Sequence, residues 1–90
     1  MTTFTLPAAV DRRAAPGLAV EISDALAKGS AVSLDGSAVQ QVGQIGLQLL
    51  LSAFKTASSR DAAIAIVDAS PALLNAAKIA GASAHLGVEA

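Results

Sequence analysis

Three short apolar segments alternate with three amphipathic segments along the chain, and this order restricts the possible folds most strongly. The apolar segments occupy residues 2–6, 31–35 and 62–67, and each has the composition or alternation typical of a β-strand. Each is followed by a stretch whose apolar residues recur at helical spacing. This repetition predicts right-handed crossovers and a mainly parallel sheet.

The predicted strands differ in their expected places in the sheet. In the first, Phe4 and Leu6 alternate with threonines, and Pro7 ends the strand or confines it to an edge. The second, at residues 31–35, is an uninterrupted apolar run before a turn, which indicates a central strand covered on both faces. Residues 84–86 could add a short edge strand. We therefore expect an α/β fold with a mainly parallel four-stranded sheet and three to four helices.

Local signals place the ends of three predicted helices. Pro16 is acceptable in the first turn of the first helix, and Gly29 can end that helix in the left-handed conformation. Ser70 is the expected N-cap of the third helix, with Pro71 as its first residue and Gly81 at its end. The predicted helices cover residues 14–28, 44–57 and 72–80.

The second and third helices carry clear apolar faces. The residues expected to be buried are Leu47, Leu50, Leu51 and Phe54 in the second helix, and Leu73, Leu74, Ala77 and Ile79 in the third. Leu49 and Leu50 together make the second helix apolar around most of its circumference. Burial against the sheet explains part of this, and a partner groove or self-association as a weak homodimer could explain the rest.

Composition excludes several classes of function. The 90 residues are sufficient for a single domain, residues 1–90, and include no cysteine, which excludes disulfides, a thiol nucleophile and thiolate metal sites. A net charge of −1 without a basic face argues against nucleic-acid binding. His85 is the only histidine, and no catalytic set or cofactor motif accompanies it. We therefore expect a protein that is not an enzyme and binds no cofactor or metal.

The apolar runs are too short for membrane insertion. The longest covers residues 49–54 and contains a serine, whereas a bilayer span requires about 20 residues. The N-terminus lacks the charged and apolar regions of a signal peptide. We therefore expect a cytoplasmic protein.

Two segments carry a family resemblance. Residues 32–39 include Asp35 and Ser37, in the arrangement Leu-Asp-x-Ser, and residues 42–50 include Gly46 and Leu47 before a run of leucines. In this order and spacing the chain resembles the STAS domains, the fold of bacterial anti-sigma factor antagonists. The resemblance implies a regulatory domain that binds a protein and has no catalytic activity.

The resemblance also indicates a position for phosphorylation, which this chain alters. In phosphorylated members of the family, the hydroxyl residue immediately before the Gly-Leu pair accepts phosphate from a partner kinase. The corresponding residue here is Ile45, which has no hydroxyl group. The start of a helix suits a phosphate because free N–H groups point at it. Because Ile45 offers no hydroxyl group at this place, we expect that the usual site is not phosphorylated.

The partner surface implied by the resemblance lies at the start of the second helix. We expect Gln41, Gln44, Ile45 and Gln48 to contact the partner, the glutamines through neutral hydrogen bonds. The resemblance implies a partner such as an anti-sigma factor or a histidine kinase-like regulator, in a sigma-factor or chemotaxis pathway. The alternative is a cytoplasmic STAS subunit of a phospholipid-transport ABC system, held by its transporter ATPase. A solvated loop and helix face would explain the same glutamines without any partner.

Overall fold

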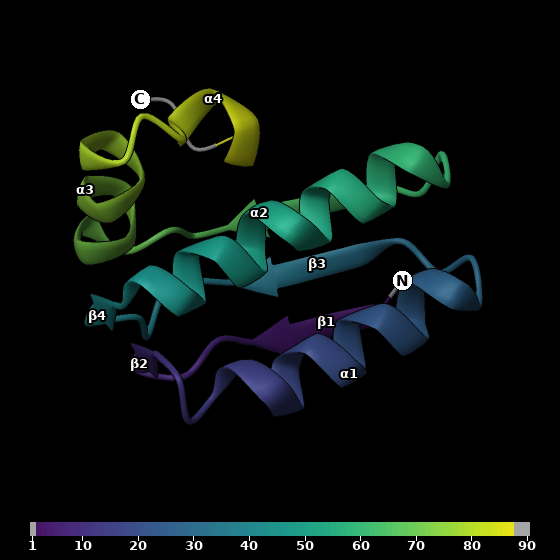
Figure 1. Cartoon of the computed structure of the whole chain (residues 1–90), viewed down its shortest axis with the longest axis horizontal. Helices are drawn as coiled ribbons and strands as arrows, with labels where there is room; N and C mark the ends of the chain where they lie inside the picture. The colour runs from purple at the N-terminus through teal and green to yellow at the C-terminus, as the bar shows by residue number, and fades with distance from the viewer. Residues whose placement is uncertain (1, 88–90) are drawn as a thin grey trace.

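The computed structural model describes residues 2–87, which form a layer of helices on a small parallel sheet (Figure 1). Residues 1 and 88–90, which the expected domain also includes, lie outside the described residues. The strands are β1 (Thr2–Thr5), β2 (Ala9–Val10), β3 (Val32–Asp35), β4 (Gln41–Val42) and β5 (Ile64–Val67). The helices are α1 (Ala15–Ala27), α2 (Gln44–Ser59), α3 (Pro71–Ile79) and α4 (Ser83–Leu86).

The main sheet is parallel and has β3 at its centre. Its order is β1-β3-β5, and Thr2 pairs with Val32, which in turn pairs with Ile64. The segments between these strands carry α1 and α2, which lie side by side across the sheet (Figure 1). The predicted parallel arrangement is therefore confirmed.

The sheet buries one face more completely than the other. Phe4, Leu34 and Ile66 occupy one row across the three strands and belong to or pack against the core. On the opposite face Ser33 is buried, but its two neighbours in the edge strands, Thr3 and Ala65, are exposed. The cover on both faces that we expected for the central strand is therefore confirmed.

The sheet does not contain the four strands that we expected. It has three, and a separate two-stranded parallel ribbon joins Ala9–Val10 to Gln41–Val42. Pro7 explains the separation of β1 from β2, because proline has no N–H to donate to a strand ladder.

The prediction of a strand at residues 84–86 is wrong, since this segment belongs to the helix α4. Gly81 ends α3 with φ +69°, and the chain turns back over the core. The N–H of Leu86 then donates to the carbonyl of Ala82 at 3.0 Å, and the Leu86 side chain is fully buried. Burial of this leucine favours a helical turn over an additional edge strand.

The other helix signals are confirmed. Pro16 lies in the first turn of α1, and Gly29 follows its end with φ +74°. A left-handed residue of this kind is strained unless it is glycine. The structure begins α1 one residue later than expected and extends α2 by two residues, to Ser59.

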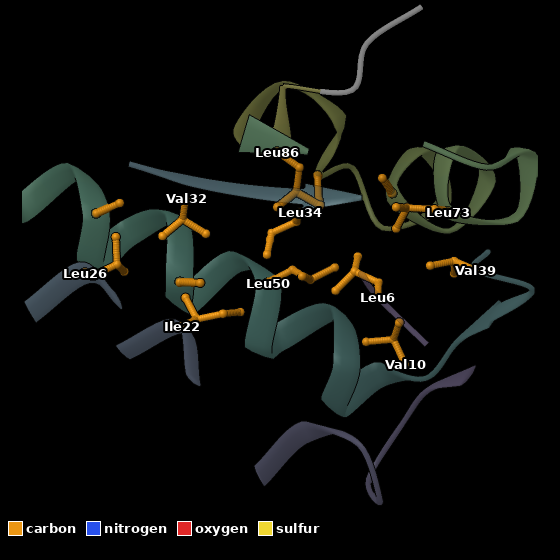
Figure 2. Close-up of a cluster of buried hydrophobic side chains, with 14 of the residues drawn as sticks. Leu6, Val10, Ile22, Leu26, Val32, Leu34, Val39, Leu50, Leu73 and Leu86 are labelled. Carbon is orange, nitrogen blue, oxygen red and sulfur yellow. The ribbon is translucent and has the colours of Figure 1, made fainter. Parts of the chain in front are cut away.

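A single aliphatic core joins the helices to the sheet. Figure 2 shows Leu50 of α2 among side chains from several elements, with Leu34 of β3 and Leu86 of α4 nearby. The buried stripe of α2 consists of Gly46, Leu50, Ala53 and Ala57. The other residues expected on the buried face of α2 are partly buried against this core: Leu47, Leu51 and Phe54.

The N-cap of α3 provides a test of local stability. The Ser70 Oγ accepts a hydrogen bond from the Leu73 N–H at 3.1 Å, and Ser70 is buried. We expect Ser70→Ala to lower the free energy of unfolding by about 1 kcal/mol, measured by urea denaturation, because the helix loses its cap. Ser23→Ala is the control, since Ser23 is an exposed serine within α1 and is not the N-cap of that helix. An equal loss in both variants would contradict the capping role.

Candidate partner-binding site

The ribbon formed by β2 and β4 positions the start of α2. The N–H of Gly43 donates to the Val10 carbonyl at 3.0 Å, and Gly43 has an extended backbone with φ −78° and ψ 168°. It is the N-cap of α2 and has no side chain to accept a hydrogen bond from the first turn. The chain therefore passes directly from a paired strand into the helix.

Gly46 allows α2 to approach this ribbon closely. A Cβ atom built at Gly46 would clash with the Val10 carbonyl oxygen and would lie 2.7 Å from the Val10 carbonyl carbon. No larger residue fits there without a shift of the backbone. The glycine of the Gly-Leu pair thus has a packing role where the chain passes from β4 into α2.

All four residues predicted to contact a partner are exposed. Gln41 lies in β4, and Gln44, Ile45 and Gln48 lie in the first two turns of α2. The structure brings Gln41 and Gln44 together along one groove, whereas Ile45 and Gln48 are not among the residues that line it. Their proposed contact with a partner stays a prediction.

The groove runs between the β4–α2 junction and α3, and we call it the α3 groove. Its volume is about 430 Å³. The residues that line it are Gln40, Gln41, Val42, Gly43, Gln44, Leu47, Ala72, Asn75, Ala76, Ile79 and Ala80. None of these side chains carries a charge. Depletion of charged residues is typical of the centre of a protein–protein interface.

Ile79 lies at the rim of the α3 groove and contradicts our prediction that it is buried. Its exposed fraction is 79%, the largest among the exposed large aliphatic residues of the described chain, whereas Leu73 and Ala77 are fully buried. A helix advances 100° per residue, so Ile79 points about 200° away from Ala77. That angular offset was readable in the sequence, and it would have placed Ile79 on the outer face.

The residue at the phosphosite-equivalent position is accessible. Ile45 is 43% exposed in the first turn of α2. A hydroxyl residue at this place would also reach solvent, so the isoleucine is not required by the core. Without an oxygen atom, the side chain cannot accept a phosphoryl group.

The Asp-x-Ser segment shapes the neighbouring turn. The Asp35 carboxylate accepts a hydrogen bond from the Ser37 N–H at 2.9 Å, and this bond lowers the pKa of Asp35 below its usual value. Gly36 between them accepts a hydrogen bond from the Ser70 N–H at 3.1 Å. The segment therefore joins the end of β3 to the start of α3, which supports a structural role for Asp35 and Ser37.

Two further hollows lie away from this site. The larger, about 860 Å³, lies between the C-terminal half of α2, the start of β5 and His85. The smaller, about 210 Å³, separates α1 from α2 and includes Leu49 in its lining. Within residues 2–87, no cluster of three or more possible metal-ligating side chains is present. In the same part of the chain, every helix is too short or too polar to cross a bilayer.

Comparison with known proteins identifies the family. Neither the curated proteins nor the solved structures contain a match to this sequence. The family described as "Mlab, STAS domain" matches residues 2–87, which covers all of the elements described above. The chain therefore belongs to the STAS domain family, as its Leu-Asp-x-Ser and Gly-Leu segments suggested.

Proposed function

We propose that this STAS domain is a non-catalytic regulatory module that binds a protein partner through the start of α2 and the adjoining α3 groove. The observation that carries the proposal is an exposed groove without charged side chains, lined in part by Gln41 and Gln44. A partner that buries this surface would remove Ile79 and the helix alanines from water without leaving an unpaired charge. The glutamine amides at its rim would supply the hydrogen bonds that orient the partner.

The proposed partner is a regulator in bacterial signalling, such as an anti-sigma factor or a histidine kinase-like protein. In the phosphorylated members of the family that the sequence resembles, a hydroxyl at the start of this helix accepts phosphate from a partner kinase. This chain carries Ile45 at that position. We therefore propose that its binding is controlled by the amount or state of the partner and not by phosphorylation here.

Ile45 also favours a second candidate function, that of a constitutive STAS subunit of a phospholipid-transport ABC system. A subunit that remains bound to its transporter ATPase needs no phosphorylation switch, and an exposed isoleucine suits a permanent apolar contact. Affinity purification of the tagged chain from its own cells, followed by mass spectrometry, distinguishes the two. Recovery of a sigma-factor or chemotaxis regulator favours signalling, and recovery of a transporter ATPase favours the transport subunit.

A charge at the proposed surface tests its location. We expect Gln44→Arg to weaken binding of the recovered partner at least tenfold, about 1.4 kcal/mol, because the cation must be desolvated at an uncharged contact. The matched control is Ser59→Arg, which adds the same charge at the other end of α2, about 22 Å away. Binding of purified partner is measured by calorimetry, with circular dichroism to verify folding. Unchanged affinity in a folded Gln44→Arg variant would mean that the partner binds elsewhere.

A further inference from the structure

The outer face of α3 has a shape that can fit a second copy of itself. Ile79 projects at one end of the α3 groove, whereas Ala72, at the other end of the helix, leaves only a methyl group in its lining. The two positions are seven residues apart, about 10 Å along the helix. An antiparallel pair of α3 helices related by a two-fold axis would therefore place each Ile79 beside the other copy's Ala72.

The small residues between these ends allow two helices to approach. Ala72, Ala76 and Ala80 recur at intervals of four along the groove, so they share one side of α3. Asn75, which is exposed beside them, offers amide groups near the centre of such a pair. Without long side chains in this row, the two backbones can come close enough for each Ile79 to contact the opposite groove.

The charges near α3 also agree with an antiparallel pair. The lining of the groove is uncharged, so a second copy brings no like-charge repulsion into the contact. The exposed Asp68 precedes the N-terminal end of α3, and the exposed Lys78 lies in its last turn. Antiparallel packing brings the Lys78 end of each copy to the Asp68 end of the other, so the opposite charges favour this direction.

We propose that the chain forms a weak homodimer in which two copies of α3 pack antiparallel across the α3 groove. A contact made by one nine-residue helix and the groove beside it is smaller than a standard interface, so the dimer is transient, with a Kd on the order of 0.1 mM. It would cover Gln41 and Gln44, so self-association and occupancy of the α3 groove by another protein exclude each other. The dimer does not depend on which partner the proposed function involves.

Sedimentation of the purified chain from about 10 µM to about 1 mM tests the dimer. We expect the fraction of dimer to rise with concentration, and Ile79→Ser to weaken the association at least tenfold. Val20→Ser is the matched control, because Val20 is another exposed aliphatic residue, 61% exposed, on α1. A chain that stays monomeric at about 1 mM, or an equal effect of both substitutions, would overturn the proposal.

Cross-linking tests the direction of the helices, and the absence of native cysteine makes it specific. In an Ala72→Cys/Ala80→Cys double variant, which keeps Ile79, the two thiols of one chain lie about 12 Å apart along α3, too far for a disulfide. Between copies, the two-fold axis brings residue 72 close to residue 80. We expect mild oxidation to give covalent dimer rapidly from the double variant and slowly from either single variant. Equal rates in the single and double variants would exclude the antiparallel arrangement.

Discussion

Gly46→Ala is expected to lower the free energy of unfolding by about 3 kcal/mol. The new methyl group would meet the Val10 carbonyl, whose carbon lies 2.7 Å from the ideal Cβ position. Val10 is itself fully buried and is paired with Val42, so neither the strand nor the helix can move away without breaking other contacts. Urea denaturation followed by circular dichroism measures the loss, and Tm should fall by more than about 10 °C.

Gly17→Ala is the matched control for this substitution. Gly17 also lies within a helix, α1, but a Cβ atom there meets no atom within 4 Å. Alanine favours the helical conformation over glycine, so this variant should be more stable than the native chain by roughly 0.5–1 kcal/mol. If both variants gained stability, the close approach of α2 to β2 would be contradicted.

Leu50→Ala is expected to destabilise the domain by about 3 kcal/mol, through the lost burial and the cavity that it leaves. Leu50 is fully buried at the middle of α2, where Figure 2 shows it among side chains from the sheet and the helices. In a domain of this size, such a loss is a large part of the total stability. Calorimetry or urea denaturation of the purified variant measures it.

The neighbouring leucine provides the control for this second substitution. Leu49 is only partly buried and lines the smaller hollow between α1 and α2. Leu49→Ala therefore removes the same atoms from a site that water already reaches, and we expect a loss of about 1 kcal/mol or less. Equal losses at positions 49 and 50 would mean that α2 presents a different side to the sheet.

The regular part of the fold could be predicted because local signals and periodicity agree with each other. Ser70 and Pro71 mark the start of α3, and Gly29 ends α1 with the positive φ that glycine adopts without strain. The strand–helix repetition then leaves few alternatives to a parallel sheet with β3 at its centre.

The tail and the small ribbon could not be predicted in the same way, since both depend on distant contacts. Residues 84–86 are short and weakly patterned, and burial of Leu86 against the core makes them helical. The ribbon pairs Ala9 with Gln41, two residues far apart in the chain, neither of which has a strong strand preference.

The candidate site was predicted in part, as exposed residues at the start of α2. The sequence places Gln41 and Gln44 close together, but only the tertiary structure brings α3 beside them. Isoleucine is usually buried, which favours the core for Ile79, whereas its angular position on α3 indicates the outer face. Apolar character alone is therefore misleading for this exposed residue, which lines the α3 groove.

The central place of β3 has a consequence for how the chain folds during synthesis. Thr2 pairs with Val32, 30 positions later, and Val32 pairs with Ile64, a further 32 positions later. At about 5–20 residues per second, β1 must wait roughly 2–6 s for its neighbour to be made, and β3 waits as long for β5. β1 thus emerges from the ribosome without its partner, and the sheet can be completed only after β5, which ends at Val67, has been translated.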